Sequence, residues 1–224
     1  EQVLNKATAY LNAKQSADGA WRSETYGLLK SGQSLTPFVL FALTDSLTGN
    51  RQPDEESIRK ALGFLRAGSD PEGVLGRTDP DFLDYPNYST AYALRSFLRF
   101  GNEDDRARIG KMTSYLEAQQ FSEEDGFKPS SPAYGGWGFG IEGRPTLSSF
   151  VDLSHTRRAL VSLAQVKPVN PKVRWRAERF LDLLQKSPQE NRSPIIPGSI
   201  REKTGRPPHD GGFFSSPTVA YANK

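Results

Sequence analysis

A short helical motif that occurs four times along the chain constrains the fold more than any other feature. It consists of a basic residue, a small or apolar residue, two variable positions, an aromatic residue and leucine. The copies are KATAYL at 6–11, KALGFL at 60–65, KMTSYL at 111–116 and RAERFL at 176–181. Apolar residues recur at helical spacing through each copy, as Val3, Ala7 and Tyr10 do in the first. Each copy is therefore predicted to be a helix with one apolar face.

A second, more apolar segment follows each copy of the motif. These segments are LTPFVLFAL from Leu35, STAYALRSF from Ser89, SHTRRALVSL from Ser154 and SPTVAYANK from Ser216. Because apolar residues surround more of their circumference, they are predicted to be the more buried helices. The Ser or Thr at the start of each predicts an N-terminal cap, in which a side-chain oxygen accepts a hydrogen bond from a free backbone N–H.

Loops rich in Gly, Pro and Asp connect the two helices of each pair, and at this density Gly and Pro cannot continue a helix. The repeating unit is therefore helix, loop and helix, and 54 residues separate Lys6 from Lys60. Such a unit cannot bury its apolar face alone, so it has to stack on its neighbours. We expect one continuous all-α array over residues 1–224, curved or closed, without an internal domain boundary.

The first pair carries a more specific pattern, KATAYLNAKQSADGAW at residues 6–21. Its basic residue, its aromatic-Leu pair, Gln15, Gly19 and Trp21 resemble the QW motif of the squalene-hopene and oxidosqualene cyclases. The later copies are degenerate, and the third keeps Gln120. Over nearly the whole chain the helix pairs resemble the prenyltransferase and squalene-oxidase repeat superfamily. This resemblance implies an α/α toroid, or a partial toroid, of about four helix-pair repeats with Gly/Pro-rich loops.

Gln15 and Trp21 are interpreted as structural rather than catalytic. A glutamine amide both donates and accepts hydrogen bonds, so it can satisfy backbone groups at the end of one helix and the start of the next. A tryptophan packs as a large apolar plate, and Gly19 permits a tight turn beside it. The pattern predicts a seal between neighbouring repeats, with Gln120 in the same role.

The acidic motif of the resembled cyclases, Asp-x-Asp-Asp-Thr-Ala, is not present in this chain. The nearest match is PNYSTA at 86–91, where Tyr88 and Ser89 stand in place of acids. A second match, DLSHTR at 152–157, keeps its first Asp and has Ser154 at the central position. The cyclases also enclose their substrate with a second toroid, for which 224 residues leave no room.

The chain contains no cysteine. This excludes a thiol nucleophile and the Asp-Cys-His zinc site of the resembled protein prenyltransferases, so we expect neither a metal nor a cofactor. It also excludes the thioester of complement-like toroids.

Several other residues are candidates for chemistry. Asp79, Asp81 and Asp84 lie close together in the sequence, and carboxylates can hold Ca²⁺ or act as acid and base, although turn-forming and capping roles are favoured. The remaining candidates for a catalytic acid or base are Asp152, Asp210 and His155, the last interpreted as a cap-region or core residue.

The stretch AYGGWGFG is the most unusual in composition. In one interpretation Tyr134, Trp137 and Phe139, with His209 from a later loop, line a cavity that receives an apolar or sugar-like ligand. In the other, which is favoured, the aromatic side chains pin a Gly-rich loop to the core.

Charge excludes some classes of partner. The net charge is +3, and the densest basic cluster, formed by Lys172, Arg174, Arg176 and Arg179, falls on a predicted helix. It is interpreted as a solvated helix face, and no nucleic-acid partner is expected. No apolar run is long enough to span a membrane.

The sequence favours a module that binds an apolar small molecule or a protein partner. The alternative is a cyclase-like or transferase-like enzyme that acts on an isoprenoid-type substrate through an Asp general acid. Since the chain starts at Glu1 and stops within an apolar run, we expect it to be part of a longer protein. The resemblance suggests a bacterial source, and a periplasmic or secreted location is favoured over a cytoplasmic one.

Overall fold

The computed structural model describes residues 2–45, 54–79, 84–141, 143–146, 150–168, 170–185 and 211–217. The chain divides into two compact units, Glu1–Tyr115 and Leu116–Lys224. The prediction of a helical fold is confirmed, because the described residues are mostly helical and contain one sheet of two short strands. Within these ranges no helix is both long and apolar enough to cross a membrane.

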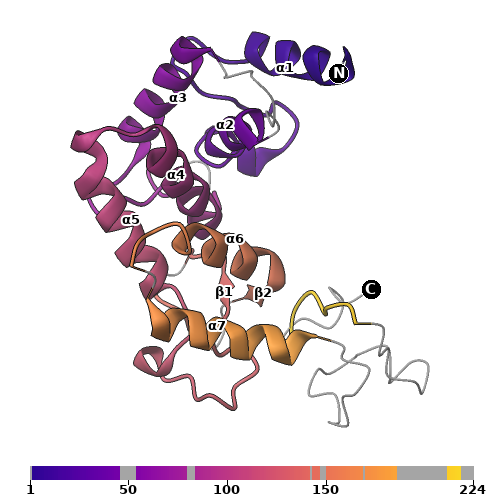
Figure 1. The fold of residues 1–224 in the computed structure, drawn as a ribbon, viewed down its shortest axis with the longest axis vertical. Helices are drawn as coiled ribbons and strands as arrows, with labels where there is room; N and C mark the ends of the chain where they lie inside the picture. The colour runs from indigo at the N-terminus through magenta and orange to yellow at the C-terminus, as the bar shows by residue number, and fades with distance from the viewer. Residues whose placement is uncertain are drawn as a thin grey trace. The chain divides into compact units, whose positions relative to one another are not determined.

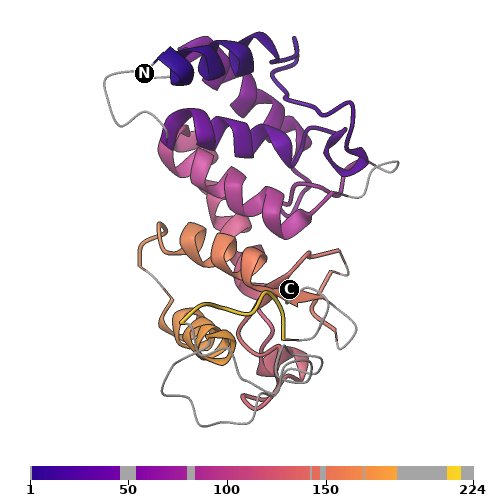
Figure 2. The same ribbon diagram turned by 90° about the vertical axis from the view of Figure 1, so that its right-hand side faces the viewer.

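The first unit consists of helices connected by Gly-rich loops (Figure 1). These are α1 (Gln2–Ala13), α2 (Leu35–Asp45), α3 (Glu55–Gly68), α4 (Pro86–Phe100) and the greater part of α5 (Arg106–Ala118), with short 3-10 turns at Gly27–Leu29 and Glu103–Asp105. Helix α2 packs against both α3 and α4, and two views at right angles show α2 and α4 side by side (Figure 2).

Local signals explain where α3 lies. The Asp54 side chain accepts a hydrogen bond from the backbone N–H of Glu56, which satisfies a free donor at the helix start. Glu55 and Glu56 occupy the first turn and Arg66 the last, so the charges oppose the helix dipole at both ends. The cap and these charges favour the observed ends of α3. The buried stripe that includes Ala61 gives the helix its single apolar face.

In the first unit the second helix of a pair is the more buried one, as the sequence predicts, while the second segment of the fourth pair, from Ser216, lies mostly outside the described residues. Ten residues of α4 are buried, against four of α3, which has nearly the same length. No residue of α1 is buried. The apolar second helices therefore supply most of the core of the first unit.

The second unit combines helices with a small antiparallel sheet. Its elements are the end of α5, a 3-10 turn at Glu123–Asp125, β1 (Trp137–Gly138), β2 (Val151–Asp152), α6 (Leu153–Leu163) and α7 (Pro171–Leu184). Its core cluster joins residues of the Gly-rich loop, β2 and α7, namely Phe121, Phe127, Ala133, Tyr134, Val151, Phe180 and Leu184.

The sheet is not predicted by the sequence. Trp137 pairs with Asp152, and Gly138 pairs with Val151. A Cβ atom at Gly138 would overlap the carbonyl oxygen of Phe150, so glycine at this position allows the two backbones to meet. Strands of two residues carry no alternating pattern that a sequence could reveal.

Candidate functional site

Gln15, Gly19 and Trp21, here called the first corner, join the first helix pair to the second. The side-chain amide of Gln15 donates to the carbonyl oxygens of Gly19, at 3.0 Å, and Ser57, at 2.9 Å, and Ser57 lies in the first turn of α3. The indole N–H of Trp21 donates to the carbonyl of Leu11 at 2.7 Å, near the end of α1. Gln15 therefore ties the loop at Gly19 to the start of α3, while the buried indole of Trp21 covers the end of α1.

Gln120, Gly135 and Trp137 form a third corner with the same hydrogen bonds. The Gln120 amide donates to the carbonyl oxygens of Gly135, at 3.0 Å, and Val173, at 2.9 Å, in the first turn of α7. The Trp137 indole donates to the carbonyl of Leu116 at 2.7 Å. Gln15 and Gly19 are 4 residues apart, whereas Gln120 and Gly135 are 15 residues apart. The third corner therefore makes the same hydrogen bonds as the first, although it has more residues between its glutamine and its glycine.

Glycine is required where each corner meets the next helix. Gly19 and Gly135 have φ angles of 91° and 85°, in the left-handed region. A Cβ atom on Gly19 would overlap the carbonyl oxygen of Lys60, and one on Gly135 would overlap that of Arg176. Lys60 and Arg176 are the basic residues that begin the second and fourth copies of the helical motif. The glycine of the preceding corner therefore contacts the same motif position in both copies.

The second corner, formed by Ser69, Gly73 and Leu75, keeps the contact without Gln or Trp. Ser69 stands where the other corners have glutamine, and its hydroxyl donates to the carbonyl of Leu65 at 2.7 Å. Gly73 has φ 82°, and a Cβ atom there would lie 2.9 Å from Cβ of Lys111. All three corners therefore share the close approach of a glycine to the next motif.

Three threonines complete the corners, in a role that sequence reasoning did not assign to them. The hydroxyl oxygens of Thr36, Thr90 and Thr156 accept from the backbone N–H groups of Trp21, at 2.9 Å, Leu75, at 3.1 Å, and Trp137, at 2.9 Å. The sequence spacing could have revealed two of them, since a threonine lies 15 residues after both Trp21 and Leu75.

The prediction that Ser89 and Ser154 cap their helices is wrong. Helix α4 begins at Pro86, three residues before Ser89, and its N-cap Tyr85 makes no side-chain cap. The N-cap of α6 is Asp152, whose carboxylate accepts from the backbone N–H of His155 at 2.7 Å. Proline is well suited to the first position of a helix, and an aspartate competes well with serine as a cap, so both helices start earlier than expected.

Among the candidate acids that the structure describes, Asp84 is the most buried, with 1% of its surface exposed. Its carboxylate accepts hydrogen bonds from the hydroxyls of Ser31 and Ser34, the latter at 2.8 Å. The Ser34 hydroxyl also lies 2.6 Å from that of Ser89. Asp84 thus joins the loops that precede α2 and α4 through a chain of hydroxyl groups.

Burial raises the pKa of the Asp84 carboxyl, although the hydrogen bonds from Ser31 and Ser34 oppose that rise. The negative charge of Asp79 raises it further. A buried carboxyl with this environment holds its proton more tightly than a solvated one does. A general acid needs such a raised pKa, because it has to carry a proton in order to donate one.

Four aromatic side chains on α2 and α4, here called the aromatic surface, lie beside this network: Phe38, Phe41, Tyr88 and Tyr92. Tyr92 is the centre of the group, with ring centroids 5.4 Å from Phe38, 5.5 Å from Phe41 and 4.9 Å from Tyr88. Tyr92 is buried, whereas Phe38 is 37% exposed. Phe41 and Tyr88 are partly exposed, so the surface has a packed base at Tyr92 and is most open to a ligand at Phe38.

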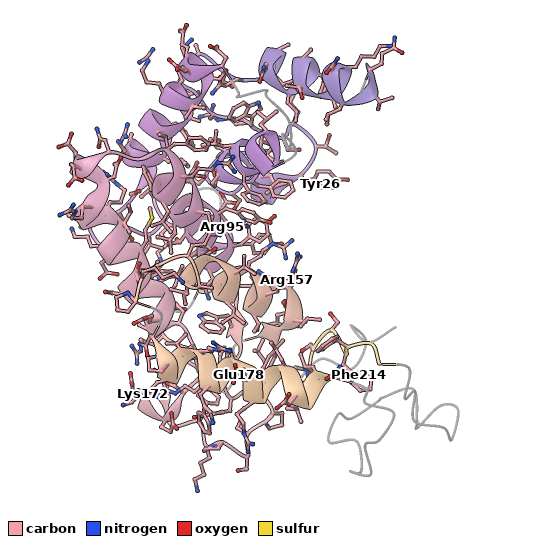
Figure 3. The ribbon with its side chains drawn as sticks, in the orientation of Figure 1. Tyr26, Arg95, Arg157, Lys172, Glu178 and Phe214 are labelled. Atoms are coloured by element: carbon pink, nitrogen blue, oxygen red, sulfur yellow. The ribbon has the colours of Figure 1, made fainter. Side chains whose placement is uncertain are left out.

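A cation borders the aromatic surface. The guanidinium carbon of Arg95 lies 3.6 Å from the ring centroid of Phe41, which is a close cation–π contact. Figure 3 shows the Arg95 side chain projecting from α4. The tyrosine at position 88, where the resembled cyclases have an acid, is thus part of an aromatic cluster.

Asp152 and His155 form a close pair at the start of α6. One carboxylate oxygen of Asp152 lies 2.8 Å from Nδ1 of His155, and both residues are buried. The ring of Phe139 meets the imidazole edge-on at a centroid distance of 4.6 Å and stacks on Phe150. A histidine oriented by a carboxylate is a common catalytic arrangement, but the Asp152 carboxylate also serves as an ordinary cap for the start of α6.

The aromatic residues of AYGGWGFG have different environments. Trp137 is fully buried, and Tyr134 is 2% exposed with its hydroxyl donating to Glu123 at 2.6 Å. Phe139 is partly exposed. Two of the three side chains thus anchor the Gly-rich loop in the core, which supports the favoured interpretation of this stretch.

Other candidate residues are not brought together. Asp79 is partly exposed, while Asp81, His209 and Asp210 lie outside the described residues. No cluster of three metal-ligating side chains occurs within the ranges that the structure describes.

On the basic face of α7, Arg176 pairs with Glu123 at 2.8 Å, and Arg174 pairs with Glu178 at 2.8 Å. Lys172 and Glu178 are both labelled on this helix in Figure 3. The acidic neighbours reduce the positive charge available to a nucleic acid.

Comparison with known proteins yields no match to a family model, to a curated protein or to a solved structure. Function therefore has to be argued from these residues.

Proposed function

We propose that this chain is a helix-pair array of the squalene cyclase and prenyltransferase kind, a toroid or partial toroid, that binds an apolar isoprenoid-type molecule. The observation that carries the proposal is the aromatic surface of α2 and α4. Aromatic faces suit extended hydrocarbons with double bonds, because they offer large, rigid apolar area at little entropic cost.

The repeated corners support the helix-pair array. Gln15 and Gln120 use the same hydrogen bonds to join one pair to the next, and the threonines at 36, 90 and 156 repeat as well. A regular step from one pair to the next is what a curved array requires. Small-angle X-ray scattering tests this part of the proposal, since a toroid and an extended array of the same mass differ in radius of gyration.

Binding is tested with squalene and geranylgeranyl diphosphate as probes, by titration and by thermal shift. Phe38→Ala is expected to weaken binding about tenfold or more, because full burial of one such side chain contributes about 1.5–3 kcal/mol. Tyr26→Ala is the matched control, since Tyr26 is 67% exposed and outside the aromatic surface. Equal affinity of both variants for the probes would count against this site.

An enzyme is the second candidate, and Asp84 is the observation that favours it. In this scheme the neutral Asp84 carboxyl gives its proton to an alkene carbon, and the aromatic faces stabilise the cation that forms. It ranks second because Asp84 is 1% exposed, so Ser31 or Ser34 has to move before an alkene can reach it.

The two candidates separate in one experiment. The chain is incubated with squalene and with polyprenyl diphosphates, and the products are analysed by mass spectrometry. Turnover by the wild type that Asp84→Asn abolishes supports the enzyme. Binding of the probes without any turnover supports the binding module and counts against the enzyme.

A further inference from the structure

One face of α1 is exposed although the equivalent face of every other motif helix is covered. Ala7 is exposed, whereas its equivalents are fully buried, namely Ala61 in α3, Met112 in α5 and Ala177 in α7. Tyr10 is 62% exposed, and the aromatic residue at its position in α7, Phe180, is fully buried. The exposed face of α1 therefore carries the same kinds of residue, at the same motif positions, as the faces that are covered in the other helices.

The preceding corner covers this face in each of the other three helices. Gly19 of the first corner abuts Lys60, Gly73 of the second abuts Lys111, and Gly135 of the third abuts Arg176. The glutamines of the first and third corners also donate to Ser57 and Val173, which occupy the position of Val3. Val3 is 81% exposed.

A fourth corner is formed by Gln185, Gly211 and Phe213. Gln185 follows its motif at the same distance as Gln15 and Gln120 follow theirs, and its side chain is exposed. Gly211 has φ 78°, like the glycines of the other corners, but a Cβ atom on it would meet no described atom within 4 Å. Phe213, at the position of Trp21 in the Asp-Gly-x-aromatic pattern, is 44% exposed.

We propose that the exposed face of α1 binds the fourth corner of a second copy of this chain. Gln185 of one copy then donates to the carbonyl of Val3 in the other, and Gly211 lies against the carbonyl of Lys6. The second copy is the occupant because it carries both halves of a contact that this fold already makes three times. Since the two faces differ, the interface is head-to-tail and can extend to further copies.

Two variants break the contact from opposite sides. Ala7→Arg places a long charged side chain on the α1 face, and Gly211→Asn fills the space at the fourth corner with a residue that tolerates positive φ. Ala9→Arg is the control, because the positions equivalent to Ala9, which are Gly63, Ser114 and Arg179, are exposed in the other helices.

Sedimentation velocity over a concentration series is the measurement. The wild type and Ala9→Arg are expected to associate, with mass rising with concentration, while Ala7→Arg and Gly211→Asn each stay at the mass of one chain. A mixture of these two variants is expected to form a dimer of one copy of each and nothing larger, since the Ala7→Arg chain keeps an intact fourth corner and the other keeps an intact α1 face.

Three results would overturn the proposal. They are a wild-type chain that stays at the mass of one chain at every concentration, association that survives Ala7→Arg, and a mixture of the two variants that stays at the mass of one chain. Thermal unfolding of Ala7→Arg serves as a check, because a lowered midpoint in the single chain indicates that its own residues cover the α1 face.

Discussion

The side-chain amide of Gln120 donates to the main-chain carbonyl of Val173, 53 residues further along the chain, at 2.9 Å. The same nitrogen donates to the carbonyl of Gly135. Because Gln120 is fully buried, water cannot replace these bonds if the side chain is lost. The contact therefore makes the packing of α7 depend on a residue just beyond the end of α5.

Gln120→Ala is expected to destabilise the chain strongly. Each carbonyl that loses its donor and stays buried costs about 1–3 kcal/mol. Gln15→Ala is expected to cost less, because Gln15 is half-buried and water can reach its partners more easily. Urea unfolding followed by circular dichroism measures both, with Gln2→Ala on exposed helix surface as the control. A Gln120→Ala midpoint equal to that of Gln2→Ala would contradict the role of this corner.

Two glycines with the same backbone angle are expected to respond differently to alanine. Gly126 and Gly135 have φ angles of 82° and 85°, so alanine at either costs about 1–2 kcal/mol of backbone strain. At Gly126 a Cβ atom meets nothing within 4 Å, but at Gly135 it overlaps the carbonyl of Arg176. Gly135→Ala is therefore expected to cost a further 1–3 kcal/mol or so, as overpacked sites do. The difference between their urea midpoints isolates the contact with α7, and equal midpoints would refute it.

Asp84→Asn is expected to change how stability depends on pH. The pKa of Asp84 is raised in the folded chain, so the folded state holds this proton more tightly than the unfolded state does. Its contribution to stability is complete below the ordinary pKa of 3.8 and is lost as pH rises through the raised value. Since asparagine does not ionise, the variant is expected to gain stability relative to the wild type as pH rises toward 7. Urea midpoints at a series of pH values test this, and a constant difference would contradict it.

Asp105 is expected to show the opposite behaviour. It is fully buried and accepts from Arg66 at 2.7 and 2.9 Å and from Arg108 at 2.9 Å. The hydrogen bonds from Arg66, the largest cause, lower the pKa of Asp105, so its contribution to stability is present above pH 3.8 and is lost as pH falls through the lowered value.

Asp105→Asn is accordingly expected to cost about 1.5–3 kcal/mol near neutral pH, because it removes the charge that accepts hydrogen bonds from Arg66 and Arg108, both of which are partly exposed to water. The cost should shrink as the wild type is acidified. The neighbouring Asp104→Asn, on exposed surface, serves as the control in the same urea titrations. A cost that does not vary with pH would show that packing, and not charge, is lost.

The sequence predicts the elements of this fold better than it predicts the candidate site. The four motif helices and the three described second helices follow from the spacing of apolar residues, which is a local property. The position of Asp84 does not, because the sequence places it in the same Asp-rich loop as Asp79. Only folding brings Ser31 and Ser34, some 50 residues earlier in the chain, against its carboxylate. The aromatic surface likewise depends on two helices that meet.

By itself, the sequence determined that this protein is built of helix pairs, since one-sided helices separated by Gly-rich loops have to stack to bury their apolar faces. Only the tertiary structure decided which carbonyl each corner contacts and which face is left uncovered. Ala7 and Ala61 are the same residue in the same motif, yet one is exposed and the other buried. Burial is set by the neighbour that a residue meets in space, and the repeated motif by itself does not record which of its copies meets one.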